Sequence, residues 1–172
     1  MRKKPFPAFA LDRHWNVAAS NSALQELYEG VDAQLMVRPV NGLRLTLHPR
    51  GMAPRIANLA EWRAHLLSRL RRQIEITGDP VREELMKEAL GYKYADAAGS
   101  LPGGHDLANA VLVPLKIHTS LDLLSVFSTT TVFGTPVDVT LSELAIEMFF
   151  PADASTAQAV LRSGAAPGAT PN

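Results

Sequence analysis

Two arginines are the residues of this chain best suited to bind a ligand. Arg63 falls within the apolar stripe of an expected helix, where its planar guanidinium could hold a carboxylate through two charge-assisted hydrogen bonds. The more common role is an internal ion pair, here with Glu61, Glu143 or Glu147, or a stem that extends to water at the helix start. Arg44 has the same two interpretations.

Other residue types that carry chemistry form no recognisable site. The five histidines lie far apart without an H-x-x-x-H pair, and no G-x-S-x-G, G-x-x-x-x-G-K or G-x-G-x-x-G motif occurs. The hydroxyl run 128–131 is typical of a strand surface, and Glu143 and Glu147 are expected to be exposed on a strand. The sequence therefore favours a binding protein over an enzyme, with neither a metal nor a cofactor.

The composition predicts a single neutral domain. The 172 residues are 47% hydrophobic, which is enough for one sizeable core. Lys plus Arg equals Asp plus Glu at 17 each, so bulk charge directs the chain neither to nucleic acid nor to an anionic membrane. Because the chain has no cysteine and no apolar run of about 18 residues, we expect a cytoplasmic protein without disulfides or membrane spans.

The first half of the chain alternates strand and helix patterns. Strands are expected at Phe9–Leu11 and Trp15–Ala19, followed by a helix at Ser22–Glu29 that Ser20 or Asn21 caps. The segment Val31–Pro49 is ambiguous, because its leucines alternate with polar residues while Gly and Pro interrupt the run.

Two longer helices are expected next. Asn58 and Glu61 have the spacing of a capping box, which predicts a helix to about Ile76 that ends at Gly78. Asp79-Pro80 predicts a second helix through Leu90, with the aspartate as cap and the proline at the first helical position. The small-residue stretch Tyr94–Asn109 is expected to form a loop.

The remainder has the two-residue period of strands. Three groups of alternating apolar residues predict three antiparallel strands, with a turn near Gly134–Pro136. The groups are Val111, Val113, Leu115 and Ile117; Leu121, Leu123, Phe127 and Phe133; and Leu144, Ile146, Met148 and Phe150. The expected fold is α+β, a PAS-like five-stranded antiparallel sheet with helices packed on one face, in which a cavity can persist between the layers. A basic leader (1–4), one domain (5–162) and a disordered tail (163–172) complete the predicted organisation.

The helix from Asn58 to Gln73 is expected to turn its apolar side inward. Leu59, Trp62, Leu66, Leu67, Leu70 and Ile74 share an arc of about 140°, the width of one core-facing stripe. Arg71 and Arg72 point away from this arc. A DNA-reading helix would gather its arginines on one face in a basic domain, so a pocket wall or plain core is favoured over DNA contact.

Four segments of the chain also closely resemble one known family. They are HWNVAASN, NGLRLTLHPRGMAPRIANLAEWRAHLLSRLRRQ, TGDP and FSTTTVFGTPVDVTLSELAIEMFFPAD. In order and spacing they are similar to the MmyB-like ligand-binding domain of actinobacterial helix-turn-helix regulators of the XRE class, over about Pro5 to Leu161. The matching positions are Trp15, Asn16, Asn41, Arg44, His48, Pro49, Asn58, Trp62, Arg63 and Phe149–Pro151.

The resemblance implies a PAS-like sensor domain that binds a small hydrophobic molecule, a fatty acid being the known kind of ligand. It also implies that DNA is contacted only through a helix-turn-helix. Only Met-Arg-Lys-Lys precedes the similar part, so that module is expected either to have been cut away or to be absent.

Together these observations predict the effector-binding half of a transcriptional regulator. The cavity wall is expected to come from Trp15, Leu24, Tyr28, Leu35, Trp62, Leu66, Leu70, Val113, Phe127, Ile146 and Met148, with Arg44 or Arg63 at any polar head. One alternative is a dimerisation module with a filled core and no ligand. Another is a small hydrolase or isomerase, for which the sequence offers no polar cluster. Assembly as a homodimer is left open.

Overall fold

The computed structural model describes residues 6–94, 113–120, 122–132 and 144–163. Several predictions concern residues outside these ranges, wholly or almost so: the basic leader, the loop after Tyr94, the turn near Gly134–Pro136 and the tail after Ser163. Outside them too lie Val111, Leu121, Phe133 and Glu143.

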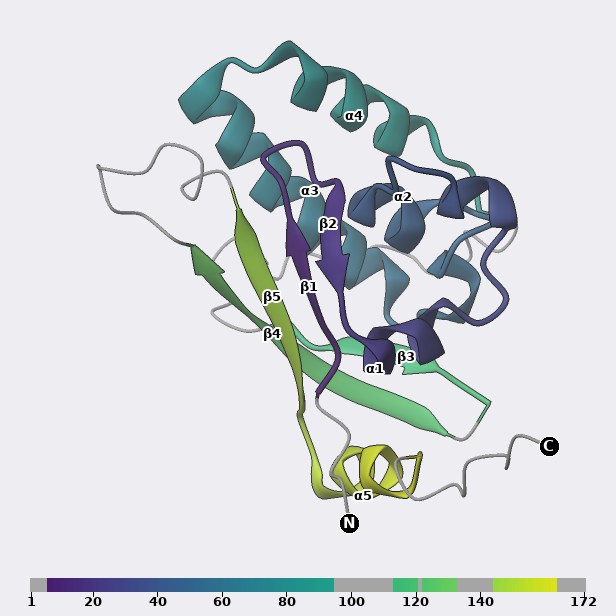
Figure 1. The fold of residues 1–172 in the computed structure, drawn as a ribbon. Coiled ribbons are helices and arrows are strands. Elements are labelled where there is room, and N and C mark those ends of the chain that lie inside the picture. The colour runs from purple at the N-terminus through teal and green to yellow at the C-terminus, as the bar shows by residue number, and fades with distance from the viewer. Residues whose placement is uncertain (1–5, 95–112, 121, 133–143, 164–172) are drawn as a thin grey trace, which may run out of the picture.

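A five-stranded antiparallel sheet forms the centre of the molecule (Figure 1). Its strands are β1 (Ala8–Leu11), β2 (Val17–Ser20), β3 (Leu115–His118), β4 (Leu123–Val132) and β5 (Ala145–Pro151), in the spatial order β2-β1-β5-β4-β3. The first strand pairs with the last, with Phe9 opposite Glu147. The N-terminal hairpin therefore extends a sheet whose other strands come from the end of the chain, and the predicted α+β class is confirmed.

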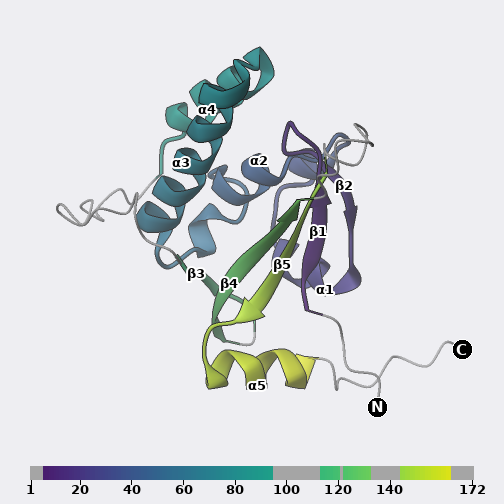
Figure 2. The same cartoon turned by 90° about the vertical axis from the view of Figure 1, so that its left-hand side faces the viewer.

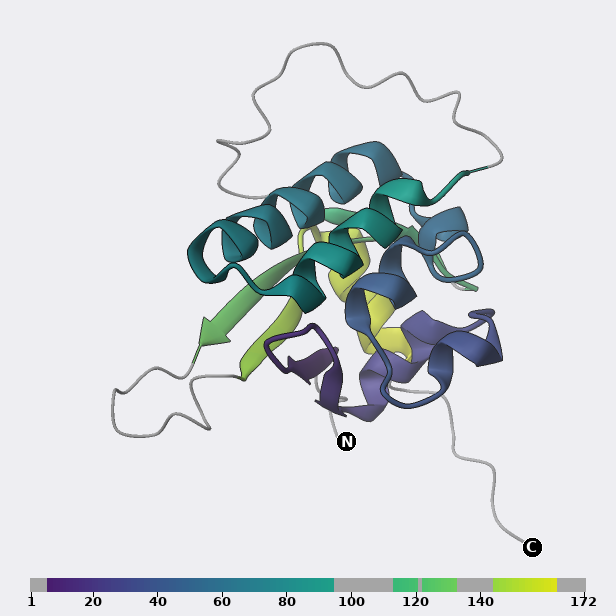
Figure 3. The same cartoon turned by 90° about the horizontal axis from the view of Figure 1, so that it is seen from above.

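Most helices lie on one face of this sheet (Figures 1 and 3). They are α1 (Ser22–Gln25), the 3-10 turns η1 (Glu26–Tyr28), η2 (Ala33–Met36) and η3 (Ala53–Arg55), then α2 (Gly42–Leu47), α3 (Leu59–Thr77) and α4 (Pro80–Gly91). The last helix, α5 (Ala154–Ser163), contacts β4 and β5 at the end of the sheet opposite α4 (Figures 1 and 2).

Several helix ends follow the predicted capping chemistry. The Asn21 side-chain oxygen accepts a hydrogen bond from the Leu24 amide at 3.2 Å, so Asn21 caps α1. Asp79 accepts from the Val81 amide at 2.9 Å, with Pro80 at the start of α4. Gly78 ends α3 in the left-handed region at a φ of 60°, which glycine adopts without steric strain.

The capping box predicted for α3 is wrong in its bonding, although the helix begins where expected. The side chain of Asn58 caps no amide of α3. Its oxygen accepts from the Lys116 amide at 2.9 Å, while its nitrogen donates to the Pro114 carbonyl at 2.8 Å and to the Glu61 carboxylate at 3.0 Å. The spacing resembles a cap because Asn58 and Glu61 do interact, but Asn58 serves to attach α3 to β3.

The segment that the sequence left ambiguous contains α2, a short helix buried on more than one side. Leu43, Leu45 and Leu47 are each at most 1% exposed, although a two-residue spacing on a helix turns successive side chains in different directions. Its neighbours include η2 and α4. The alternation of leucines therefore reflects a helix enclosed by the fold.

The prediction that Ile146 and Met148 face the helices is wrong. In β5 the buried positions are Glu147 and Phe149, and Met148 is 36% exposed. Phe150 lies on the same side of the strand as Met148 and stacks with Phe127 at a centroid distance of 5.7 Å. Both faces of β5 carry large apolar residues, so apolar alternation alone cannot indicate which face packs against α3.

Gly51 provides a test of the packing around α2. A Cβ at this position would collide with the Leu45 carbonyl oxygen and would lie 3.1 Å from the His48 carbonyl oxygen, both of them backbone atoms that cannot swing aside. We expect Gly51→Ala to lower the free energy of unfolding by about 2 kcal/mol or more, as overpacking does. Urea unfolding followed by circular dichroism measures this change.

Gly91→Ala is the matched control, because a Cβ there meets no atom within 4 Å. It should leave stability unchanged or slightly raised. Equal stability of the Gly51→Ala protein and the wild type would show that α2 is more loosely held than described.

Candidate ligand-binding site

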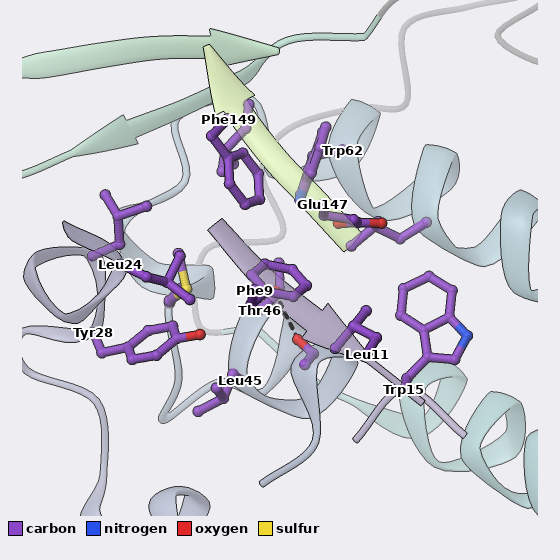
Figure 4. Close-up of a pocket in the computed structure, with 15 residues that line it drawn as sticks. Phe9, Leu11, Trp15, Leu24, Tyr28, Leu45, Thr46, Trp62, Glu147 and Phe149 are labelled. Atoms are coloured by element: carbon purple, nitrogen blue, oxygen red, sulfur yellow. Dashed lines mark hydrogen bonds between the residues drawn. The ribbon is translucent and has the colours of Figure 1, made fainter. Parts of the chain in front are cut away.

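A small cavity lies between the sheet and the helices (Figure 4). Most of its lining is apolar and comes from both layers. The sheet contributes Phe9, Leu11, Leu115 and Phe149; the hairpin turn contributes Trp15; and the helical layer contributes Leu24, Leu27, Tyr28, Leu45, Met52, Trp62 and Leu66.

The enclosed space is limited. Its volume of about 30 Å³ has room for about two water molecules. Pockets that enclose whole organic ligands are typically at least about 300 Å³. An organic molecule can occupy this site only if part of the lining moves.

Glu147 is the one charged residue of the lining within the part of the chain that the structure describes, and it is only 5% exposed. Its carboxylate forms an ion pair with Arg69 of α3 and accepts a longer hydrogen bond of 3.4 Å from the Thr130 hydroxyl. A carboxylate buried without a cation would be unstable in this apolar setting, so the pair joins the inner face of β5 to α3. The expectation that Glu147 is exposed is therefore wrong.

Trp62 supplies an unsatisfied donor. The residue is 4% exposed, and its indole Nε1 has no hydrogen-bond partner among the residues that the structure describes. Figure 4 shows the ring at the edge of the cavity between Phe149 and Glu147. On its other side the ring stacks with His65 at a centroid distance of 5.4 Å. Burial and the nearby Arg69 and Arg72 lower the pKa of His65, so this neighbour is mainly neutral near pH 7.

Tyr28 adds a neutral polar group. Its hydroxyl points toward the middle of the cavity (Figure 4), and burial raises the pKa of this phenol above its usual value. It therefore stays protonated in the physiological range and can both donate and accept a hydrogen bond.

The turn that carries Trp15 is held by a polar network. The Asp12 carboxylate accepts from the amides of His14 and Asn16 at 2.8 Å each. Buried Asn41 donates to the His14 carbonyl at 2.9 Å, and its oxygen accepts from the first amides of α2. Trp15 itself has a φ of 68°, which is unfavourable for a bulky residue and persists only where the surroundings enforce it.

Five of the predicted wall residues line the cavity: Trp15, Leu24, Tyr28, Trp62 and Leu66. Leu70 and Val113 belong to the buried core outside this lining, and Leu35 lies in η2 away from it. Phe127, Ile146 and Met148 are also outside it, on the opposite face of the sheet.

Neither arginine expected at a polar head lines the cavity. Arg44 holds Glu88 of α4 through its Nε and one terminal nitrogen, at 2.7–3.0 Å, and this pairing lowers the pKa of Glu88. Arg63 donates to the Ala89 and Leu90 carbonyl oxygens at the end of α4, at 3.2 and 3.4 Å. Both side chains join α4 to the rest of the fold. Arg44 forms an internal ion pair, as its alternative interpretation allowed, whereas Arg63 bonds to backbone carbonyl oxygens.

Several lining residues were missed from the sequence. The alternation of Phe9 and Leu11 in the first strand was sufficient to place both on the inner face. No comparable pattern marks Glu147, because a lone charged residue in a strand is usually exposed. Its partner Arg69 lies over Trp15, with the guanidinium carbon 4.8 Å from the ring centroid.

Comparison with known protein families identifies a match over most of the chain. A family model described as the MmyB-like transcription regulator ligand binding domain matches residues 1–162. No curated protein matches the chain significantly. Within the described residues, no helix is long and apolar enough to cross a membrane.

The pair between Arg69 and Glu147 is testable by a double-mutant cycle. Arg69→Met leaves a buried carboxylate without its cation and should lower the free energy of unfolding by about 3 kcal/mol. Arg69→Met with Glu147→Gln removes both charges and should recover at least about half of that loss. Exposed Arg72 of the same helix is the control, and Arg72→Met should change stability by less than about 0.5 kcal/mol. Additive losses in the double variant would contradict a coupled pair.

Proposed function

Because the chain belongs to the family of MmyB-like transcription regulator ligand-binding domains, we propose that it binds a small, mainly apolar, fatty-acid-like molecule between its sheet and its helices. The observation that supports this most directly is the cavity itself. Apolar side chains from both layers converge there around a buried donor, Trp62 Nε1, that no group of the described residues satisfies. A ligand oxygen or a water molecule is the partner that this donor lacks.

Binding must enlarge the cavity, and the segment Ser22–Tyr28 is the part of the lining best suited to move. It consists of a four-residue helix and one 3-10 turn, so displacing it breaks few backbone hydrogen bonds. Leu24, Leu27 and Tyr28 would move with it. The sheet and α3 are held by long ladders and by the Arg69–Glu147 pair, and they form the fixed side of the site.

Such a movement would connect occupancy to regulation. A ligand changes the population of an arrangement only if it binds that arrangement better than another. Here the ligand would favour the arrangement in which Ser22–Tyr28 is displaced. We assign DNA contact to a helix-turn-helix module and not to this domain, because Arg71 and Arg72 are isolated surface residues and the net charge is zero.

A dimerisation module with a filled core is the second candidate. It is favoured by the small volume of the cavity, about 30 Å³, because a filled core also leaves little empty space. It is also favoured by exposed apolar residues away from the cavity, including Phe6, Met148 and Val132. In that case no ligand exists, and assembly of two copies would be the function.

Native mass spectrometry of the purified protein, followed by organic extraction, separates these two functions. We expect a bound lipid-like molecule, or else a rise in melting temperature with at least one of a panel of fatty acids, because a ligand that binds only the folded state stabilises it. A ligand-free mass, no shift across the panel and concentration-dependent dimerisation would together support the dimerisation module.

Leu66→Trp tests the location of the site. Leu66 is 5% exposed and lines the cavity, so an indole there would take up the space that a ligand needs. Affinity for a fatty acid that binds the wild type should fall at least about tenfold, which corresponds to a loss of about 1.4 kcal/mol or more of binding free energy. Isothermal titration calorimetry measures the affinity.

Ile76→Trp is the matched control, because Ile76 lies on the same helix and is 83% exposed. It should bind like the wild type. Unchanged affinity in a folded Leu66→Trp protein would move the binding site elsewhere.

A further inference from the structure

A second hollow lies beside the cavity and has a different chemical character. It has a volume of about 120 Å³ and lies where the β1–β2 turn meets α3 and the start of α4. Among the described residues its polar lining consists of Asp12, Arg13, Arg69, Gln73 and Arg82, of which three are cationic.

Arg82 is the residue of this hollow that a bound anion would stabilise most. It is only 8% exposed, and its hydrogen bonds go to uncharged oxygens: the Arg13 carbonyl at 2.7 Å and the Thr77 hydroxyl at 3.0 Å. Among the residues that the structure describes, no carboxylate lies within ion-pair distance of Arg82. A buried cation without a counter-charge is costly, which favours an anionic occupant of the hollow.

The acidic groups nearby are already engaged. Asp12 accepts three hydrogen bonds within its own turn, from two amides and the Asn16 side chain. Asp79 pairs with His14 at 2.9 Å, and Glu147 pairs with Arg69. None of these carboxylates is in ion-pair contact with Arg82.

The two hollows share a boundary. Leu11 and Trp15 line both of them, and the Arg69–Glu147 pair stands between them, with Glu147 on the apolar side and Arg69 on the polar side. Trp15 is held there by its Nε1, which donates to Gln73 at 2.8 Å. A molecule that passes Trp15 would have its chain among leucines and phenylalanines and its end among arginines.

Glu147 also determines the orientation of the ligand between the apolar cavity and the polar hollow. A ligand carboxylate inside the apolar cavity would lie close to the buried Glu147 carboxylate, and two like charges in a poorly solvated site repel strongly. In the polar hollow the same carboxylate would meet the Arg82 guanidinium, whose planar fork suits it.

We infer that the polar hollow is a carboxylate site in which Arg82, beside Arg69 and Gln73, holds the anionic head of an amphipathic ligand whose chain lies in the apolar cavity. This inference rests on the proposed function and adds to it where the head group lies and how the ligand is oriented. The sequence had assigned the head to Arg44 or Arg63, which are bonded elsewhere.

Calorimetry of the full chain with dodecanoate and with dodecan-1-ol tests the head-group site. We expect the wild type to bind dodecanoate at least about tenfold more tightly than the alcohol, because only the carboxylate makes a charge-assisted bond. Arg82→Gln should remove most of this preference, because it weakens binding of dodecanoate far more than binding of the alcohol. Arg82→Lys keeps the charge and should retain part of the preference, and Arg72→Gln on the exposed side of α3 should retain all of it.

The possible results distinguish the head-group site from the proposed function. Equal affinity of the wild type for dodecanoate and dodecan-1-ol overturns the head-group site and leaves the proposed function intact; this comparison holds even if Arg82→Gln does not fold. Binding of neither compound overturns both. A rise in melting temperature with inorganic phosphate that Arg82→Gln abolishes, without any carboxylate preference, would identify a separate anion site and would also overturn the inference.

Discussion

Burial of the Glu147 carboxylate constrains the arrangement of the whole domain. An ionised group in the inner face of a sheet needs a cation at a fixed place, and the helix packed on that face must supply it. Arg69 does so from α3, which sets the rotation and position of this helix relative to β5. The guanidinium in turn lies over Trp15, so the hairpin turn is positioned from the same point.

Other polar side chains then fix the positions of the remaining helices. Asn41 connects the hairpin turn to α2, and Arg44 and Arg63 connect α2 and α3 to α4. Each of these side chains bonds to a group that would otherwise be an unpaired charge or backbone atom, so they stabilise the helical layer without occupying the cavity. The apolar space is left to side chains that form few hydrogen bonds, so some of them can move without breaking the polar contacts of the layer.

Local rules predicted the parts of the fold that depend on local chemistry. Asp79, Pro80 and Gly78 act within a turn or two of helix, and the ends of α3 and α4 followed from them. The inner face of β5 did not follow, because Ile146, Met148 and Phe150 form a more apolar set than Glu147 and Phe149. The choice between the faces depends on Arg69, which is 78 residues from Glu147 along the chain. Similarly, only the fold decides that Asn58 bonds to β3 and not to the first turn of its own helix.

The positions of the two tryptophans have a spectroscopic consequence. The chain contains only Trp15 and Trp62, and both line the apolar cavity. Indole emission responds to the polarity of its surroundings and to neighbouring charged or aromatic groups, and here these include the guanidinium of Arg69 and the ring of His65. The tryptophan fluorescence of the native protein therefore originates entirely at the cavity lining, and the unlabelled domain carries its own optical reporter of what enters it.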